Sequence, residues 1–235
     1  MSDNRSENII IAVPKGRILE ELIPLMKKAN ILPEKSFFDN KDRRLLFSSN
    51  IPWLKIIRVR SFDVATFVAF GGADIGIAGF DVLREFNYPE LYIPIDLNIG
   101  VCHLSVAQPK NYNKNDNVQL KIATKYPNIT NNYYAEKGIN VNCIKMNGAM
   151  EIAPKLEMAD KIVDLVSSGK TLIANDLVEI ENILDVTSHL VINRTAFKTR
   201  SEKIRDIMIF FREALNEKIL NFISVSYFTI FIFKC

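Results

Sequence analysis

The first part of the chain alternates short apolar runs with segments whose apolar residues recur every three or four positions. Residues 9–14, 54–60 and 74–79 are apolar runs bounded by turn residues, a pattern typical of buried strands. Residues 17–31 and 62–71 have helical spacing of their apolar positions. Strands that alternate with helices in this way predict a parallel sheet with covering helices.

The pattern restarts after residues 91–100, which predicts a second α/β unit similar to the first and a hinge near residues 94–102. The elements predicted there are strands at 103–109, 119–126, 141–146 and 161–166, helices at 128–139 and 149–159, and a polar loop at 110–117. A final helix is expected over about 201–221, where apolar residues line one face.

The segment Ser167-Ser168-Gly169-Lys170-Thr171 follows the last of these strands. Its Gly-Lys-Thr portion looks like the end of a nucleotide-binding P-loop, but that motif needs a glycine five residues before Gly169, where this chain has Asp164. A carboxylate followed by a hydroxyl-rich turn suits a sugar phosphate, with the acid on ribose hydroxyls and the turn on the phosphate. From these residues alone, an ordinary turn between a strand and a helix is an equally good interpretation.

A second segment with potential for anion binding is 14–17, Pro-Lys-Gly-Arg, at the predicted start of a helix. Basic residues are mildly unfavourable at a helix N-terminus, which favours a polyphosphate ligand over a merely solvated helix start. The arginines Arg43, Arg44, Arg58 and Arg60 could form surface ion pairs or gather around one anion site.

Composition narrows the class of protein. The chain has 235 residues, of which 48% are hydrophobic, and its formal net charge of +3 is too small to indicate nucleic-acid binding. Its three cysteines have neither the number nor the spacing of a disulfide framework or zinc site, and the sequence opens without a signal peptide, so we expect a cytoplasmic protein. The apolar tail at 219–233 is interpreted as a packed strand or helix extension, with a membrane anchor as the alternative.

The sequence offers no obvious nucleophile or general base. Both histidines, His103 and His189, lie in apolar runs and are interpreted as packed, and the motifs GxSxG and HExxH do not occur. We therefore expect chemistry that depends on positioning and charge stabilisation.

The chain resembles the short form of ATP phosphoribosyltransferase, the enzyme of the first step of histidine biosynthesis, from about residue 9 to about residue 200. The matching segments are IAVPKGRILEE at 11–21, GADIGIAGFDVL at 72–83, KIATKYPNIT at 121–130, NGAMEIAP at 147–154, ADKIVDLVSSGKTLIAN at 159–175 and HLVINRTAFKTR at 189–200.

This resemblance implies a two-lobed α/β fold of the periplasmic-binding-protein type (type II), with the active site in the cleft between the lobes. Lobe I would comprise residues 1–97 and about 185–235 on the ATP side, and lobe II about 98–184 with the phosphoribosyl pyrophosphate loop. The implied activity is a magnesium-dependent glycosyl transfer, in which adenine N1 of ATP attacks the anomeric carbon of 5-phosphoribosyl 1-pyrophosphate and releases pyrophosphate.

The resemblance also implies residue roles. Lys15, Arg17 and Arg43 would be catalytic, and Lys15, Gly16, Arg17, Arg43 and Arg60 would bind ATP. Phosphoribosyl pyrophosphate would be bound by Glu151, Asp164, Ser167, Ser168, Gly169, Lys170, Thr171 and Leu172. Residues that hold the metal are unknown, and Mg²⁺ is expected to be held mainly by the substrate's pyrophosphate.

Four features depart from the family pattern, one of which is Ala65 in place of a usual proline. Phe80 stands where the family usually has lysine, Asp176 replaces a likely turn glycine, and the tail beyond about residue 215 matches nothing in the family. Asp tolerates left-handed backbone better than most residues, so we expect the turn at Asp176 to be retained.

Short forms of this family lack a regulatory domain. The resemblance to the short form therefore implies a catalytic homodimer that assembles with a regulatory subunit similar to histidyl-tRNA synthetase, and we expect no nucleic-acid or membrane partner. Two alternatives are a non-catalytic two-lobed module that binds a phosphorylated ligand and a subunit that has lost activity.

Overall fold

The computed structural model describes residues 8–39, 41–113 and 119–232, with residues 217–232 described by their backbone alone. It divides into two compact units. The first unit contains the described residues up to Gly79, then Tyr88–Gly100 and the residues from Ser188 on; the second contains Phe80–Asn87 and Val101–Thr187. The segment Phe80–Asn87 therefore belongs to the second unit, whereas the sequence prediction assigned it to the first lobe.

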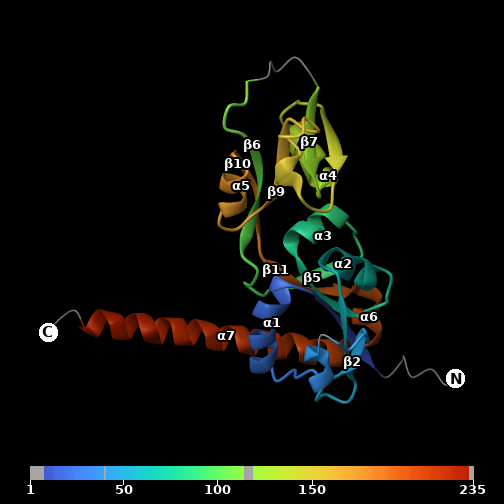
Figure 1. Ribbon diagram of the computed structural model, residues 1–235. Helices are drawn as coiled ribbons and strands as arrows, with labels where there is room; N and C mark the ends of the chain where they lie inside the picture. The colour runs from blue at the N-terminus through green and yellow to red at the C-terminus, as the bar shows by residue number, and fades with distance from the viewer. Residues whose placement is uncertain (1–7, 40, 114–118, 233–235) are drawn as a thin grey trace. The chain divides into compact units, whose positions relative to one another are not determined.

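The first unit is built on a six-stranded mixed sheet in the order β2-β3-β1-β4-β11-β5. Figure 1 shows its elements along the chain. They are β1 Ile9–Pro14, α1 Arg17–Lys28, the 3-10 helix η1 Lys35–Phe38, β2 Leu46–Ser48, β3 Leu54–Val59, α2 Ser61–Ala69, β4 Ile75–Gly79, β5 Leu91–Asp96, β11 Ser188–Asn193, α6 Arg194–Thr199 and α7 Ser201–Ile232.

Helices cover this sheet by burying their apolar stripes. Leu22 and Met26 of α1 and Ile204 and Phe211 of α7 lie in one hydrophobic core with alternate residues of β1. Helix α2 packs very closely on the sheet, because a Cβ added at Gly76 of β4 would lie 2.7 Å from side-chain atoms of Val64 and Val68.

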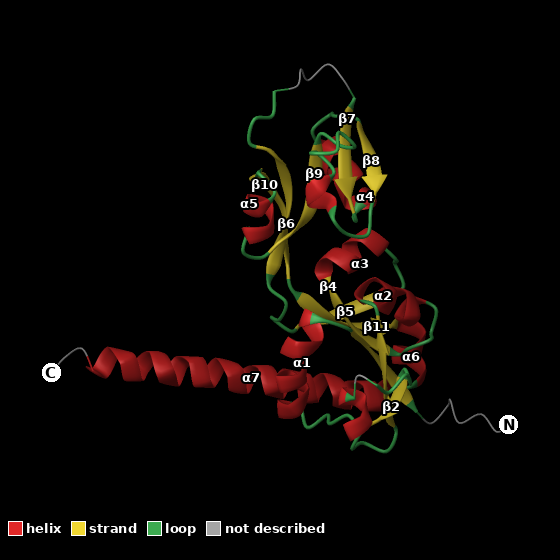
Figure 2. Cartoon of the chain, in the orientation of Figure 1, coloured by secondary structure: helices red, strands yellow, loops and turns green. Residues whose placement is uncertain are grey.

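The second unit is built on a five-stranded mixed sheet in the order β10-β6-β9-β7-β8. Figure 2 distinguishes its strands from its helices. Its elements are α3 Phe80–Phe86, β6 Cys102–Pro109, β7 Leu120–Thr124, α4 Pro127–Glu136, β8 Val141–Lys145, the 3-10 helix η2 Met150–Ile152, β9 Lys161–Val166, α5 Lys170–Ala174 and β10 Leu177–Val186.

One face of this second sheet carries a small core in which Met150 of η2 and Leu172 of α5 pack against Ile162 and Val166 of β9. Because side chains alternate along a strand, Asp164 lies on the same face as Ile162 and Val166. The turn that follows β9 leads directly into α5, whose Leu172 packs on this face.

The predicted parallel sheets are confirmed only in part. β3-β1-β4 and β9-β7-β8 are parallel, whereas β6, β10 and β11 pair antiparallel with their neighbours. Strand β11 follows β10 after the single residue Thr187, so the chain returns to the first sheet without the crossover helix that a parallel strand needs.

The helix predicted at 149–159 is wrong. Only Met150–Ile152 form a helix there, of the 3-10 type, followed by turns. Ala149 and Glu157 both have left-handed backbone, with φ of 56° and 57°, and Pro154 supplies no amide hydrogen. These features interrupt a helix that the apolar spacing alone would allow.

Two further predictions fall wholly or partly outside the described residues. In the polar loop at 110–117, residues 114–117 are not described, and the side chains of the apolar tail at 219–233 are not described either. The backbone of α7 runs to Ile232. In the described part of the chain, no helix combines the length and the apolar character needed to cross a membrane.

Candidate active site

The turn after β9 has the geometry expected of an anion-binding loop. Gly169 adopts left-handed backbone with φ of 68°, which glycine reaches without steric cost. Ser167 and Ser168 are exposed, so their hydroxyls and the turn amides are available to a ligand. Leu172 is different, since its side chain is buried in the core of the second unit and leaves only its backbone for a substrate.

Asp164 lies on β9, two residues before the end of the strand, in a partly buried position. Burial raises the pKa of its carboxyl group to about 6, and the nearby Glu151 and Asp81 carboxylates add to the rise. The Leu165 amide, 2.8 Å from Asp164 Oδ1, and the cation of Lys125 oppose this shift. A partly buried carboxyl group whose pKa is raised in this way marks a candidate functional site.

Asp81 and Tyr126 are candidate site residues that the sequence interpretation missed. The hydroxyl of Tyr126 donates a 2.7 Å hydrogen bond to Asp81 Oδ2, and both residues are buried. Burial raises the pKa of Asp81, and the bond from Tyr126 partly offsets this rise. Asp81 also interacts electrostatically with Asp164, so the Tyr126–Asp81 pair is part of the same site.

Helix α3 is attached to α4 by a second carboxylate. Glu85 is buried, and its two carboxylate oxygens accept from the amides of Asn128 (3.1 Å) and Ile129 (3.0 Å) in the first turn of α4. The side-chain amide of Asn128 donates back to the Glu85 carbonyl at 3.0 Å. These bonds, with that of Tyr126 to Asp81, explain why α3 belongs to the second unit although it directly follows β4.

The first unit contains a basic cavity of about 560 Å³. It is lined by Lys15, Gly16, Leu19, Glu20, Ile23, Asp42, Arg43, Arg44, Leu45 and Arg58. Three of the five predicted ATP-binding residues, Lys15, Gly16 and Arg43, thus lie around one cavity. Neither Lys15 nor Arg43 makes an ion pair with any residue that the structure describes.

The other cations of this cavity are held by the protein. Arg58 donates to the Phe37 carbonyl at 2.7 Å and lies over the Phe37 and Phe47 rings. Arg44 pairs with Asp42 at 2.7 Å and with Glu34 at 3.2 Å. Lys15 and Arg43 are therefore the cations left available for a phosphate ligand.

Arg17 and Arg60 do not line this cavity. Arg17 extends from the first turn of α1 towards Glu21, with Nε to Oε1 at 3.6 Å, and towards the Gly100 carbonyl at 3.5 Å. Arg60 is exposed and directly precedes α2. In the described part of the chain, no hydrogen bond or ion pair joins Arg17 or Arg60 to Lys15 or Arg43.

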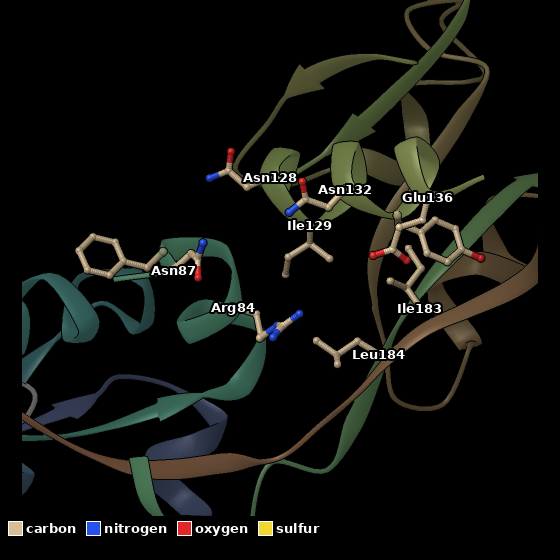
Figure 3. A pocket seen from close by; sticks show the side chains of 10 residues that line it. Arg84, Asn87, Asn128, Ile129, Asn132, Glu136, Ile183 and Leu184 are labelled. Carbon is tan, nitrogen blue, oxygen red and sulfur yellow. The ribbon is translucent and has the colours of Figure 1, made fainter. Parts of the chain in front are cut away.

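A second cavity, of about 510 Å³, lies in the second unit between α3, α4 and β10. Figure 3 shows Arg84 of α3, Ile129 and Asn132 of α4 and Leu184 of β10 around it. None of the predicted site residues lines this cavity. Its surroundings are mainly asparagine and aliphatic side chains, with Arg84 and Glu136 as the charged groups.

Metal ligands are not clustered in the described part of the chain. No group of three or more His, Cys, Asp or Glu side chains there is arranged to hold a metal ion. The described residues thus offer two candidate anion sites, one in each unit, and no preformed metal cage.

Comparison with known proteins decides the family. The family model for ATP phosphoribosyltransferase (HisG) matches residues 60–213. An ATP phosphoribosyltransferase from Rhodospirillum rubrum is 56% identical over 213 residues, covering 89% of this chain and 94% of that protein. The enzyme of the same name from Paramagnetospirillum magneticum is 53% identical over 212 residues, covering 88% and 97%. The chain belongs to the ATP phosphoribosyltransferase family.

Solved structures agree with this family and with the predicted fold. The ATP phosphoribosyltransferase (HisG:HisZ) complex from Thermotoga maritima contains a chain that matches with a TM-score of 0.77 and 30% identity, covering 89% of this chain and 99% of that one. The periplasmic sulfonate-binding protein SsuA from Methylobacillus flagellatus matches with a TM-score of 0.55 at 14% identity, covering 89% and 68%. The type II periplasmic-binding-protein fold expected from the sequence is confirmed.

Two departures from the family pattern now have a structural description. Asp176 adopts left-handed backbone with φ of 57°, and its carbonyl accepts from the Lys110 amide at 3.1 Å, so the expected turn is retained. Phe80 is the first residue of α3, and the guanidinium of Arg84 lies 6.0 Å from the centre of its ring. A cation is thus present one helical turn away from the position where the family usually has lysine.

Proposed function

We propose that this protein catalyses the reaction of ATP with 5-phosphoribosyl 1-pyrophosphate to give N1-(5-phosphoribosyl)-ATP and pyrophosphate. It is a glycosyltransferase of the first step of histidine biosynthesis. The observation that carries the proposal is the hydroxyl-lined turn Ser167–Gly169 beside Asp164, in a chain of this family.

In this proposal the second unit binds phosphoribosyl pyrophosphate. The amides and hydroxyls of Ser167, Ser168, Gly169 and Thr171 hold the 5′-phosphate, and Asp164 and Glu151 accept hydrogen bonds from the ribose hydroxyls. Lys170 is exposed, so its ammonium can approach the phosphate from the solvent side. Leu172 would contribute through its backbone.

In the first unit we assign ATP to the basic cavity. Lys15, Gly16 and Arg43 would contact its phosphates, and Arg17 and Arg60 would contact the ATP or pyrophosphate oxygens from outside the cavity lining. The cavity volume of about 560 Å³ falls within the range of ordinary ligand sites.

The chemistry requires little acid or base catalysis. Adenine N1 carries a lone pair at neutral pH, and magnesium pyrophosphate is a good leaving group. The protein needs to align N1 with the anomeric carbon and to stabilise the negative charge that develops on the departing pyrophosphate. Lys15, Arg17 and Arg43 are the groups we assign to that stabilisation.

Magnesium fits this scheme as an ion carried by the substrate. The described residues form no three-ligand cluster, whereas a pyrophosphate offers several oxygens and Mg²⁺ commonly binds through phosphates with few protein carboxylates. Bound in this way, the ion would neutralise charge on the leaving group.

We further propose that the chain forms a homodimer and works with a regulatory subunit similar to histidyl-tRNA synthetase. The support is the structural likeness to a chain of the Thermotoga maritima HisG:HisZ complex. A cytoplasmic location is proposed because ATP and phosphoribosyl pyrophosphate are made inside the cell. Light scattering after gel filtration should give a dimer alone and a larger species with the partner; a monomer under both conditions would refute the assembly.

Arg17 gives the sharpest test of the catalytic assignment. We expect Arg17→Ala to lower kcat by about 100-fold or more, the range for loss of one group that stabilises transition-state charge. Its melting temperature should barely change, because exposed ion pairs such as Arg17–Glu21 contribute little to stability. Arg205→Ala, at an exposed position of α7, is the matched control and should retain wild-type turnover. Near-normal turnover of Arg17→Ala would remove Arg17 from the mechanism.

The two alternative functions give different results in the same assay. A non-catalytic module would bind phosphoribosyl pyrophosphate and form no product, and an inactive subunit would bind neither substrate. None of the findings favours either alternative.

A further inference from the structure

A hydrogen-bonded group of three side chains lies on the strands next to the turn Ser167–Gly169. His103 Nε2 donates to Glu179 Oε1 at 2.7 Å, and Ser105 Oγ donates to the same oxygen at 2.7 Å. Ser105 is fully buried, whereas the side chains of His103 and Glu179 are 31% and 35% exposed. The sequence context suggested that His103 is packed in an apolar core. The structure instead places it in this polar group, partly exposed to solvent.

Strand register places this group close to the turn. In the antiparallel pair of β6 and β9, His103 lies opposite Val166 and Ser105 lies opposite Asp164. Residues directly opposite each other share a face of the sheet, so His103 and Asp164 point to the same side. Val166 is the last residue of β9 and directly precedes Ser167, which puts His103 at the base of the turn.

The bond to Glu179 fixes the orientation of the imidazole ring. Glu179 lies opposite Ala107, which in turn lies opposite Ile162 near the start of β9. Nε2 therefore points back along the sheet, away from the turn. The other ring nitrogen, Nδ1, has no hydrogen-bond partner among the described residues, and its N–H bond diverges from that of Nε2, so it is available to a ligand at the end of β9.

We infer that His103 is a binding residue for the 5′-phosphate of phosphoribosyl pyrophosphate, acting as a cation whose Nδ1–H donates to a phosphate oxygen. Glu179 would hold the ring in place through Nε2–H and balance the imidazolium charge, and Ser105 would hold Glu179. Both ring nitrogens of a protonated histidine are donors, so the two bonds can form together. This inference rests on the proposed function, because it assumes that the turn holds that phosphate.

Carboxylates outnumber cations around His103 and the turn. Besides Glu179, the strands carry Asp185, directly opposite His103 on β10, and Asp164 on β9. Glu151, Asp81 and the cation Lys125 also interact electrostatically with Asp164. Lys170, in the first turn of α5, is the cation contributed by the loop itself. A positive His103 would offset part of this negative charge beside a phosphate held in the turn.

The experiment is a calorimetric titration of the purified full chain with ribose 5-phosphate, which carries the phosphate and ribose but no pyrophosphate. His103→Asn keeps a short hydrogen-bonding side chain and removes the charge, and we expect it to bind about tenfold more weakly than wild type. His103→Arg restores a cation that can pair with Glu179, and it should bind within about threefold of wild type. His189→Asn, on β11 of the first unit, is the matched control and should bind as wild type does.

Each outcome is informative. Equal binding by His103→Asn and wild type would overturn the inference. Weakened binding by both His103 variants, with unchanged circular dichroism, would mean that the ring acts by shape and not by charge, which also overturns it. If wild type itself binds neither ribose 5-phosphate nor phosphoribosyl pyrophosphate, the proposed function fails, and the two failures are thereby distinguished.

Discussion

At the scale of single residues, Asp164 is a proposed binding residue for the ribose, and burial of its carboxylate lowers the stability of the folded protein. Burial raises the pKa of its carboxyl group to about 6 from an ordinary value of 3.8. The folded protein thus binds this proton more tightly than the unfolded chain. The contribution of Asp164 to stability is greatest when the group is protonated, decreases as the pH rises from about 4 to about 6, and stays low above that range.

Asp164→Asn should therefore stabilise the protein while impairing its function. At pH 7 we expect a gain of roughly 1–3 kcal/mol in the free energy of unfolding, and a loss of affinity for phosphoribosyl pyrophosphate. Urea unfolding of both proteins between pH 4 and 7 measures the difference, which should grow with pH up to about 6. A variant less stable than wild type at pH 7 would show that the ionised carboxylate does not destabilise the folded protein.

Tyr126 should matter to stability because it bonds a buried carboxylate. Tyr126→Phe leaves Asp81 without its 2.7 Å hydrogen bond, and we expect a loss of about 1–3 kcal/mol. Tyr134→Phe is the matched control, because the Tyr134 hydroxyl is buried and has no hydrogen-bond partner among the described residues. Thermal unfolding should separate the two, and equal melting temperatures would contradict the role given to Tyr126.

Sequence reasoning could find some of these residues and not others. Asp164 and the turn were identified because they are neighbours in the chain and their residue types suggest a sugar phosphate. Asp81 and Tyr126 are 45 residues apart, and only folding brings them together. His103 was misread because its neighbours in sequence are apolar, whereas its partner Glu179 is 76 residues away.

At the scale of elements, the turn after β9 depends on the backbone of Gly169. A Cβ at this position would meet nothing within 4 Å, so a substitution is disfavoured by the backbone conformation alone. Gly169→Ala should cost about 1–2 kcal/mol in the turn conformation and raise KM for phosphoribosyl pyrophosphate several-fold. Gly169→Asn should behave closer to wild type, because asparagine visits this conformation more readily. Steady-state kinetics test this, and the reverse order of the two variants would contradict it.

Elements with strong local patterns were predictable from the sequence. β1, α1, β3 and β9 follow directly from apolar runs and helical spacing. The helix expected at 149–159 failed because the backbone at Ala149 and Glu157 is left-handed, which apolar spacing does not reveal. The antiparallel pairing of β6, β10 and β11 was missed because it depends on how the chain passes between the two units.

At the scale of the whole molecule, we assign one substrate to each unit. The second unit provides the turn and its carboxylates, and the first provides the cavity with Lys15 and Arg43. The fold class was predictable because six sequence segments match the family in order. The placement of α3 in the second unit was not predictable, because it depends on the hydrogen bonds that Glu85 accepts from α4.

The proposed reaction is tested most directly by identifying its product. The chain is incubated with its regulatory partner, Mg²⁺, ATP and phosphoribosyl pyrophosphate, and the mixture is analysed by mass spectrometry and NMR. The account predicts one adduct of ATP and ribose 5-phosphate, joined at adenine N1, formed together with one equivalent of pyrophosphate. Binding of both substrates without this adduct, or an adduct joined at a different atom, would contradict it.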